Sequence, residues 1–341
     1  MEPPKGLPTI SIVVPTYNSE RVLRECLQSI ECQNYPKEKI ELIIADAGST
    51  DKTLGIAREY TNNIVANPLK TGEAGKAIGV KNTKNEIVAF IDSDNVLPAT
   101  DWLMTMIEPF SDESIVGVEP ISYTHRRQDN HITRYCALLG MNDPICLFLG
   151  NYDRYSFISG KWTGMDVKQE DKGTYIRIEL VEKNLPTIGA NGFMIRRDEL
   201  DKIEVGNYLF DIDMIFHLIR NGSNRFAKVK IGIVHLFSGS MSTFIRKQRR
   251  RIKDYTYYKQ KGLREYPWST FNKLGLLRFV TYTLLTIPLM MQVVRGYLRK
   301  HDIAWLLHIP ACWFTLLIYG SHALEGFLRE PTLEDRQNWS Q

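Results

Sequence analysis

Two aspartates one residue apart, Asp92 and Asp94 in the segment FIDSDN, point most directly to chemistry. They follow a hydrophobic run, and in extended backbone residues i and i+2 point to the same side. Close carboxylates repel each other unless a cation lies between them, and their oxygens suit Mg²⁺ or Mn²⁺ shared with phosphate groups. Such pairs also occur in turns and helix caps, so their place in the chain decides between the two interpretations.

The elements that must position these carboxylates form an α/β pattern. Short β-branched runs lie at residues 9–14, 40–45 and 87–91, and amphipathic helical stretches lie between them at roughly 20–32, 51–60 and 74–84. Apolar strands that alternate with helices predict a parallel sheet covered on both faces. Such sheets bind ligands beyond the carboxyl ends of their strands. Asp46 ends one of these runs and Asp92 follows another, so both are expected at the binding edge.

Two common nucleotide-binding motifs are excluded by the residues at this edge. A dinucleotide-binding fold needs a glycine-rich turn after the first strand, but residues 15–18 read PTYN. A P-loop needs GxxxxGK[ST], whereas residues 72–77 read GEAGKA, with the wrong spacing and no hydroxyl for magnesium. Any phosphate site must therefore be of another kind.

The composition is that of an ordinary globular protein. The chain has 341 residues, enough for one large or two modest domains, with 43% hydrophobic and 24% charged residues. Its formal net charge of +4 is too small to argue for a nucleic-acid partner. The 5 cysteines are odd in number and lack CxxC pairing, which indicates reduced thiols and neither zinc ligands nor disulfides.

The C-terminal third combines one basic run with two apolar runs. Residues 246–253 read RKQRRRIK, and the apolar runs at 276–294 and 303–320 approach the ~20 residues that cross a hydrocarbon core. A pair of buried core helices is the alternative. Aromatic residues near the ends of the runs favour a membrane hairpin, which Pro288 and Pro310 are expected to kink.

The orientation of this hairpin stays open. The basic run before the first span, and the lack of a signal pattern at the N-terminus, favour a cytosolic N-terminal part. The connecting loop at 295–302 is basic as well, which a simple hairpin would place outside. Either the heavier basic run before the first span determines the orientation, or one apolar segment is re-entrant or lies in the membrane interface.

Four ordered motifs carry a resemblance to a known family. The series SIVVPTYN, IIADAGSTD, GKAIGVKN and FIDSDN resembles the family 2 inverting glycosyltransferases. The resemblance implies an α/β fold of the GT-A type. That fold is a mixed, mainly parallel sheet with flanking helices, here followed by amphipathic interface helices and a C-terminal transmembrane segment. It also implies a set of residues that bind the nucleotide sugar: Pro15, Tyr17, Asp46, Lys76 and Asp92. Asp94 would hold the Mn²⁺ or Mg²⁺ that bridges the diphosphate.

The acceptor side of the family is matched further along the chain. Phe210-Asp211-Ile212-Asp213 resembles the family's acidic FDED motif, with Ile212 in place of the usual glutamate. A carboxylate here can act as general base toward the acceptor hydroxyl, and we favour Asp213 over Asp211 for this role. His235, in IVHLF, matches the position of a further metal ligand in many such enzymes, although a lone strand histidine is more often structural.

A third motif precedes the apolar runs. Gln248-Arg249-Arg250-Arg251-Ile252 resembles the QxxRW motif of cellulose-synthase-like members, so Gln248 and Arg251 are expected to assist the departing diphosphate. Isoleucine replaces the tryptophan on which a growing sugar chain would stack, which argues against processive synthesis. The alternative is a polybasic patch that meets anionic lipid, and both roles can coexist.

The resemblance as a whole is to a minimal cellulose-synthase-like enzyme, close to archaeal membrane mannosyltransferases. It implies GDP-mannose as donor, a polyprenyl or dolichyl-phosphate-linked acceptor, membrane lipids as partners and a location in the cell membrane with the catalytic domain facing the cytoplasm. The expected domains are a glycosyltransferase domain at 1–240, a basic interface segment at 241–272, a transmembrane hairpin at 273–325 and a polar tail at 326–341. A processive polysaccharide synthase that uses a UDP-sugar, or a non-catalytic membrane scaffold, are the alternatives.

Overall fold

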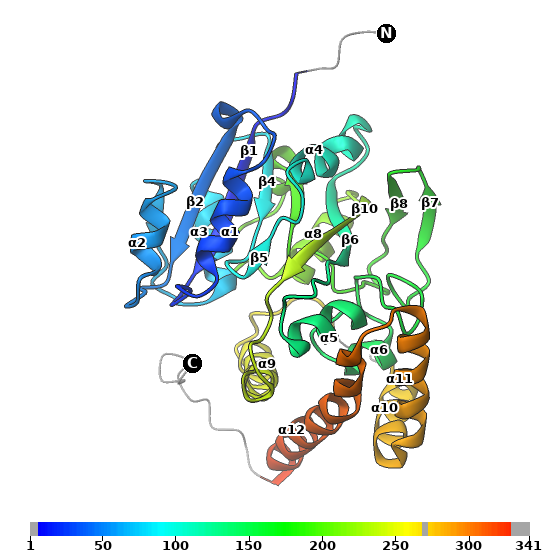
Figure 1. Cartoon of the computed structure of the whole chain (residues 1–341). Helices are drawn as coiled ribbons and strands as arrows, with labels where there is room; N and C mark the ends of the chain where they lie inside the picture. The colour runs from blue at the N-terminus through cyan, green and yellow to red at the C-terminus, as the bar shows by residue number, and fades with distance from the viewer. Residues whose placement is uncertain (1–5, 268–271, 329–341) are drawn as a thin grey trace. The chain divides into compact units, whose positions relative to one another are not determined.

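The computed structural model describes residues 6–267 and 272–328, so most of the predicted polar tail lies outside the described residues. The chain divides into two compact units (Figure 1). The first holds the residues up to Thr124 together with Asp166–Leu236, and the second holds His125–Met165 together with the residues from Phe237 onward. This division differs from the expected boundary at residue 240, because a segment inside the predicted glycosyltransferase domain belongs with the C-terminal helices.

The first unit is built on one mixed sheet, as expected, with strand order β3-β2-β1-β4-β9-β6-β10-β8-β7 among its described residues. Its N-terminal strands pair in parallel, β1 with β2 and β4 and β2 with β3, whereas β9 pairs antiparallel with both β4 and β6. β5 pairs with the end of β10. The strands are β1 Ile10–Thr16, β2 Ile40–Asp46, β3 Ile64–Ala66, β4 Ile87–Phe90, β5 Asn95–Val96, β6 Gly117–Tyr123, β7 Lys168–Asp171, β8 Tyr175–Glu179, β9 Phe193–Arg196 and β10 Arg225–His235.

The helices that flank this sheet are α1 Leu23–Glu31, α2 Thr53–Arg58, α3 Gly72–Lys81, α4 Trp102–Ile107, α7 Arg197–Leu200 and α8 Asp211–Arg220. The first three are shorter than the helical stretches predicted from the sequence. Two glycines one turn apart let α3 lie directly on β1. A Cβ on Gly79 would fall 2.2 Å from Val13 Cγ1, and one on Gly75 would fall 2.9 Å from Pro15 Cβ. Gly75, which lies in the segment that fails as a P-loop, therefore serves close helix-to-sheet packing together with Gly79.

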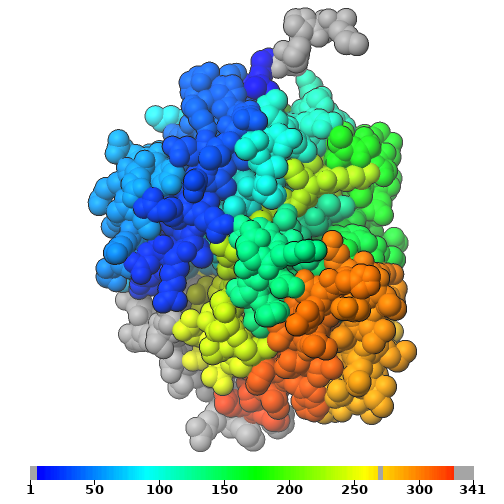
Figure 2. All heavy atoms as spheres, in the orientation of Figure 1, coloured from blue at the N-terminus to red at the C-terminus, as the bar shows by residue number. Residues whose placement is uncertain are grey.

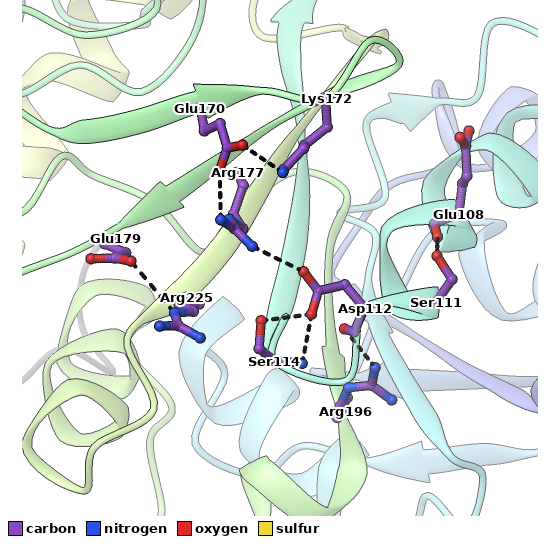
Figure 3. Close-up of polar contacts among 10 residues, drawn as sticks. All are labelled: Glu108, Ser111, Asp112, Ser114, Glu170, Lys172, Arg177, Glu179, Arg196 and Arg225. Atoms are coloured by element: carbon purple, nitrogen blue, oxygen red, sulfur yellow. Dashed lines mark hydrogen bonds and ion pairs between the residues drawn. The ribbon is translucent and has the colours of Figure 1, made fainter.

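The far edge of the sheet is fastened by ion pairs on the surface (Figure 3). Arg177 on β8 contacts Glu170 on β7 at 2.5 Å and Asp112 at 3.4 Å. Lys172 contacts the other oxygen of Glu170 at 2.6 Å. These side chains are about a third to a half exposed, so each pair contributes little to the stability of the unit.

The second unit is helical in its described part. Its elements are α5 His131–Leu139, α6 Ile145–Leu149, α9 Met241–Gln260, α10 Lys273–Leu285, α11 Ile287–Arg299, the 3₁₀ turn η4 Ile303–Leu307 and α12 His308–Leu328. Two apolar clusters hold these helices together. One packs α5 against Phe244 of α9 and Trp305 of η4, and the other packs α6 against Phe279, Leu289 and Cys312 of α10, α11 and α12.

The apolar runs do not form two straight spans. The first run breaks at Thr286, whose φ is 61°, into α10 and α11, whose axes differ by 97°. Pro288 lies in the first turn of α11, where its missing N–H leaves no helical hydrogen bond unmade. Pro310 lies in the first turn of α12, which runs on without a break, so the predicted kink there is absent. Among the described residues, one helix, Ile303–Glu325, is long and apolar enough to cross a membrane, or two if the bent pair is one span.

Candidate active site

The N-terminal strands of the first unit bring their carboxyl ends to one edge of the sheet. β1 pairs in parallel with β2 and with β4, in registers that place Thr16 beside Asp46 and Val13 beside Phe90. The segments after these strands hold the predicted nucleotide-sugar residues. Pro15 is buried against Gly75 of α3, and Tyr17 is half-buried just beyond β1.

Asp46 organises the loop that follows β2. Its carboxylate accepts hydrogen bonds from Thr16 Oγ1 at 2.9 Å, from the backbone N–H groups of Gly48 and Ser49, both at 2.9 Å, and from Ser49 Oγ at 2.6 Å. Asp46 as a whole is only 5% exposed. Both carboxylate oxygens are therefore occupied by protein donors, and Asp46 shapes the loop around the predicted nucleoside position.

The two aspartates of FIDSDN do not lie in extended backbone, because β4 ends at Phe90 and residues 93–94 form a turn. Asn95 N–H donates to Asp92 O at 2.8 Å and closes this turn. The expected same-side geometry is therefore absent, and the two carboxylates have different neighbours. Asp94 Oδ1 lies 3.4 Å from His235 Nε2, while the charge of Asp92 acts on Lys76 and Asp211.

A buried polar chain behind this turn was not predicted from the sequence. Asn95 Nδ2 donates to Asn191 Oδ1 at 3.0 Å, and Asn191 Nδ2 donates to Tyr123 Oη at 3.1 Å. The Tyr123 ring lies 5.4 Å from that of His235. Asn191 has a φ of 47° and precedes Gly192, whose φ is 90°. The ANG triplet, with two residues that tolerate positive φ, was the available signal.

Lys76 and Asp211 form the central charged pair of the site. Lys76 Nζ lies 2.6 Å from Asp211 Oδ1; the lysine side chain is 6% exposed and the aspartate side chain 31%. Burial, and to a lesser extent the charge of Asp92, raises the pKa of Asp211 to about 6 although Lys76 opposes the change. Burial lowers the pKa of Lys76, but the carboxylates of Asp211 and Asp92 together raise it more, so the lysine stays charged.

The helix geometry of α8 separates Asp211 from Asp213. Asp211 is the first residue of the helix, and two residues correspond to a rotation of about 200°. The two side chains therefore leave the helix on nearly opposite faces. Asp211 faces Lys76 and is partly open to solvent, whereas Asp213 is 6% exposed. The geometry favours Asp211 as the acid available to a ligand, contrary to the preference for Asp213 drawn from the sequence.

The donor set at Asp94 and His235 fits a divalent cation that also binds phosphate. The two side chains converge within 3.4 Å, and no group of three or more His, Cys, Asp or Glu suited to a metal occurs among the described residues. Mg²⁺ and Mn²⁺ commonly take one or two protein ligands and complete their shell with water and substrate phosphates. Two protein ligands are therefore enough when the ligand itself carries a diphosphate.

Gln248 and Arg251 belong to the second unit, where a polar network holds them. Gln248 is fully buried; its Nε2 donates to Asn142 O at 2.8 Å, and its Oε1 accepts from Arg251 Nη1 at 2.5 Å. Arg251 Nη1 also lies 3.4 Å from Asp143 Oδ2. Tyr319 of α12 contacts the same oxygen of Asp143 at 2.5 Å and Gln248 Oε1 at 3.1 Å. Asp143 and Tyr319 were not predicted, because nothing local marks them.

Comparisons with known proteins concern the family and the fold of this chain. The sequence model of glycosyl transferase family 2 matches residues 11–203. The poly(ribitol-phosphate) beta-N-acetylglucosaminyltransferase TarS of Staphylococcus aureus is 38% identical over 93 residues, which are 26% of this chain and 16% of that protein. A dolichyl N-acetyl-alpha-D-glucosaminyl phosphate 3-beta-D-2,3-diacetamido-2,3-dideoxy-beta-D-glucuronosyltransferase of Methanococcus voltae is 33% identical over 108 residues, 30% of this chain and 33% of that protein. Both matches cover less than half of the relative's own length.

A solved structure extends the likeness to nearly the whole chain. The mannosyltransferase PcManGT of Pyrobaculum calidifontis, crystallised with GDP-mannose and Mn²⁺, superposes with a TM-score of 0.55 at 15% sequence identity, over 96% of this chain and 89% of that one. At this identity the likeness concerns the fold, which is GT-A-like. Since the family's sequence model covers more than half of the chain, this protein belongs to glycosyl transferase family 2.

Proposed function

We propose that this protein transfers a sugar from a nucleoside diphosphate sugar to a lipid-linked acceptor, with inversion at the anomeric carbon. The observation that carries the proposal is the cluster at the edge of the sheet. Lys76 and Asp211 form an ion pair on which the charge of Asp92 acts. Asp94, two residues further on, converges with His235, and the loop of Asp46 adjoins β1. A buried cation, a cation-binding pair and a partly open carboxylate are the groups that diphosphate departure and proton removal need.

Each predicted residue of the first unit except Asp213 has a proposed role in this reaction. Pro15, Tyr17 and the loop held by Asp46 receive the nucleoside, and Asp94 with His235 holds Mn²⁺ or Mg²⁺. When bound, the cation would neutralise charge on the diphosphate. Asp92 and Lys76 set the field around Asp211, which we assign as the general base in place of Asp213. Its pKa of about 6 lets it be ionised at neutral pH while it can still accept a proton.

Gln248 and Arg251 keep their proposed role toward the departing diphosphate. This role rests on the resemblance to the QxxRW motif and on the exposure of Arg251, whose side chain is 39% exposed. An exposed guanidinium can donate paired hydrogen bonds to phosphate oxygens. Gln248, which is buried, would orient Arg251 through their 2.5 Å contact.

The finer substrate assignment is GDP-mannose as donor and a polyprenyl or dolichyl-phosphate-linked acceptor at the cytoplasmic face of a membrane. It rests on the sequence resemblance. The name of the Methanococcus relative includes a dolichyl-linked acceptor, and the Pyrobaculum protein was crystallised with GDP-mannose and Mn²⁺. The C-terminal apolar helices agree with a lipid acceptor.

The test is a transfer assay with the full chain in mild detergent. GDP-mannose, UDP-glucose and UDP-N-acetylglucosamine are each supplied with Mn²⁺ and with either a polyprenyl phosphate or a lipid-linked glycan. We expect one GDP-mannose-dependent product carrying a single added sugar. Long polymer from a UDP-sugar would support a processive synthase instead, and no transfer or donor hydrolysis with any pair would refute the proposal.

A paired substitution tests the cation site within the same assay. Asp94→Ala should abolish the Mn²⁺-dependent part of nucleoside diphosphate binding, measured by calorimetry with and without the metal. Asp101→Ala, which removes an exposed aspartate at the start of α4, is the matched control and should bind as the wild type does. Equal Mn²⁺ dependence in wild type and Asp94→Ala would remove Asp94 from the site.

A further inference from the structure

The bent pair α10 and α11 exposes a continuous run of apolar side chains around its bend. Six of them are each more than half exposed: Leu284, Leu285, Ile287, Met290, Met291 and Val294. We name these six residues the bend surface. The face of α11 is hollowed into a shallow groove of about 660 Å³, lined by four residues of the bend surface, by Leu298 and by Arg295 and Arg299. Soluble proteins rarely expose apolar areas of this kind unless they bind a partner or a membrane.

Neither helix of the pair can cross a bilayer. Each has 13 residues, which span about 20 Å, whereas the hydrocarbon core is about 30 Å thick. The 97° bend between them prevents the two from adding into one straight span. The pair is therefore long enough to enter one leaflet and return.

Both ends of the pair are fixed to one short stretch of the second unit. At the start of α10, Asn272 Nδ2 donates to Leu149 O at 3.2 Å. At the end of α11, Arg299 Nη1 donates to Phe157 O at 3.0 Å and to Ile158 O at 3.1 Å. The two ends therefore return to the same part of the protein, while the bend surface lies between them.

The charges of the pair are arranged for an anionic lipid surface. Residues 279–294 contain no Asp, Glu, Lys or Arg. Basic residues are confined to the two ends: Lys273, Arg278, Arg295, Arg299 and Lys300. No acidic residue offsets them anywhere between 273 and 300. Apolar side chains at the bend and cations at both ends match an acyl layer below a layer of anionic headgroups.

The helix that could cross a membrane by length, Ile303–Glu325, is held near both ends by polar groups of its own unit. Figure 2 shows the atoms of α12 (red and orange) beside those of α9 (yellow). Near its start Asp302 pairs with Arg134, and His308 Nδ1 contacts Tyr135 Oη at 2.9 Å. Towards its end Tyr319 contacts Asp143, and His322 Nε2 contacts Thr256 Oγ1 of α9 at 2.9 Å.

These contacts argue against a crossing by α12. Asp302 and His322 are 20 residues apart, which is about 30 Å along a helix and equals the thickness of the hydrocarbon core. If this helix crossed the bilayer, α9 and Asp143 would have to enter the core with it. α9 carries RKQRRRIK, and charged side chains at that depth are costly.

We infer that this protein is a monotopic membrane protein: the bend surface of α10 and α11 inserts into one leaflet of an anionic bilayer, and no described segment crosses it. The occupant of the exposed apolar face is thus lipid, not another protein chain. This inference concerns how the protein is attached and does not rest on the proposed reaction. It replaces the transmembrane hairpin expected from the sequence.

Sided labelling of the full chain bound to preformed vesicles tests the inference. Single cysteines are placed at Lys300, Ser321 and Leu285 in a background in which the exposed Cys32 is serine. The vesicles contain phosphatidylcholine with phosphatidylglycerol, and the label is a membrane-impermeant maleimide added outside. We expect Lys300→Cys and Ser321→Cys to react equally from outside, and Leu285→Cys to react at least tenfold more slowly than without vesicles. Labelling of Ser321→Cys only after the vesicles are permeabilised would show a crossing and overturn the inference.

Vesicle co-sedimentation supplies a second measurement with a matched control. Leu285→Glu combined with Met291→Glu should lower the bound fraction by about tenfold or more, because both substitutions place charge in the acyl layer. Val181→Glu changes an apolar residue of the first unit that is also more than half exposed, and it should leave binding unchanged. Unchanged binding of the double variant, or a stable dimer that does not bind vesicles, would refute insertion. Sugar transfer is measured separately, so either conclusion can fail without the other.

Discussion

Each of the two units holds a carboxylate beside a cation, next to or at a residue predicted to be catalytic. The first unit exposes the carboxylate of its pair, and the second exposes the cation. In the first unit Lys76 is buried and Asp211 is 31% exposed. In the second unit Asp143 is 7% exposed and Arg251 is 39% exposed. The first unit therefore presents an acid whose pKa is raised, and the second presents a cation that its acid holds in place. A proton acceptor and a diphosphate-binding group are the two parts that sugar transfer requires.

The largest expected effect follows from breaking the acid of the first unit. Asp211→Asn should lower the rate of transfer to a glycan acceptor by about 10²–10⁴-fold, the usual contribution of general-base catalysis. Donor affinity should stay nearly intact, since the change removes basicity more than shape. Asp213→Asn is the matched comparison two residues away and should cost much less. Single-turnover transfer measures both, and a larger loss in Asp213→Asn would return the role to that residue.

The pH dependence sharpens the same assignment. A base must be deprotonated to work, so the rate should rise with pH through about 6, the pKa of Asp211, and level off above it. Asp211→Asn should remove this limb of the profile. If the acceptor is a lipid phosphate, which is already ionised near neutral pH, no base is needed. Both the limb and the mutational loss should then be small.

A third charged pair, which is fully buried, is expected to affect the stability of the first unit and to have no direct contact with a ligand. Lys228 and Glu119 lie 2.6 Å apart in the core of the first unit, with both side chains 0% exposed, so neither can meet a ligand. Lys228→Met should lower the free energy of unfolding by about 3–5 kcal/mol, because it leaves a buried charge unpaired. Lys228→Met with Glu119→Gln should recover a large part of this loss. Urea unfolding measures both, and equal stability of the single and double variants would contradict the argument.

The first unit was the more predictable one because its determinants are local. Strands at residues 10–16, 40–46 and 87–90 agree closely with the β-branched runs in the sequence. Parallel pairing then brings the segments after them to one edge. What the sequence did not give was backbone detail. A turn replaced the extended geometry at Asp92 and Asp94, and the rotation of α8 leaves Asp211 more exposed than Asp213.

The second unit was poorly predicted because its contacts join distant segments. Its polar network joins Asp143, just before α6, to Arg251 of α9 and Tyr319 of α12. No periodicity or motif connects these residues. The hydropathy of the sequence located both apolar helical regions. It cannot show that the first one breaks at Thr286 or that the second one makes polar contacts.

A moderate effect is expected when the acid of the second unit is neutralised. Asp143→Asn removes the charge beside Arg251, and the guanidinium should then hold its position less well. A hydrogen bond to a charged group is worth about 1.5–3 kcal/mol, so transfer should fall by about tenfold or more. Tyr319→Phe should cost less, since it removes one hydroxyl and no charge. A positioning role predicts that the loss disappears when Arg251→Ala is already present, whereas a merely structural role predicts additive losses in single-turnover rates.

The smallest effect is expected at the surface pairs of β7 and β8, which present neither an acid nor a cation to a ligand. The hydrogen bond from Lys172 and the charge of Arg177 lower the pKa of Glu170, and a hydrogen bond from Ser114, with Arg177, lowers that of Asp112. A carboxylate whose pKa is lowered by folding stabilises the folded state at any pH above the pKa that it has in the unfolded chain. This stabilisation is lost as the pH falls through the lower pKa of the folded state.

Arg177→Ala should therefore lower Tm by about 2 °C or less at neutral pH. The Tm values of wild type and variant should converge at acid pH and in high salt. Thermal unfolding across pH measures this; a large, salt-independent loss, or a change in transfer rate, would place Arg177 among the groups that act on the reaction.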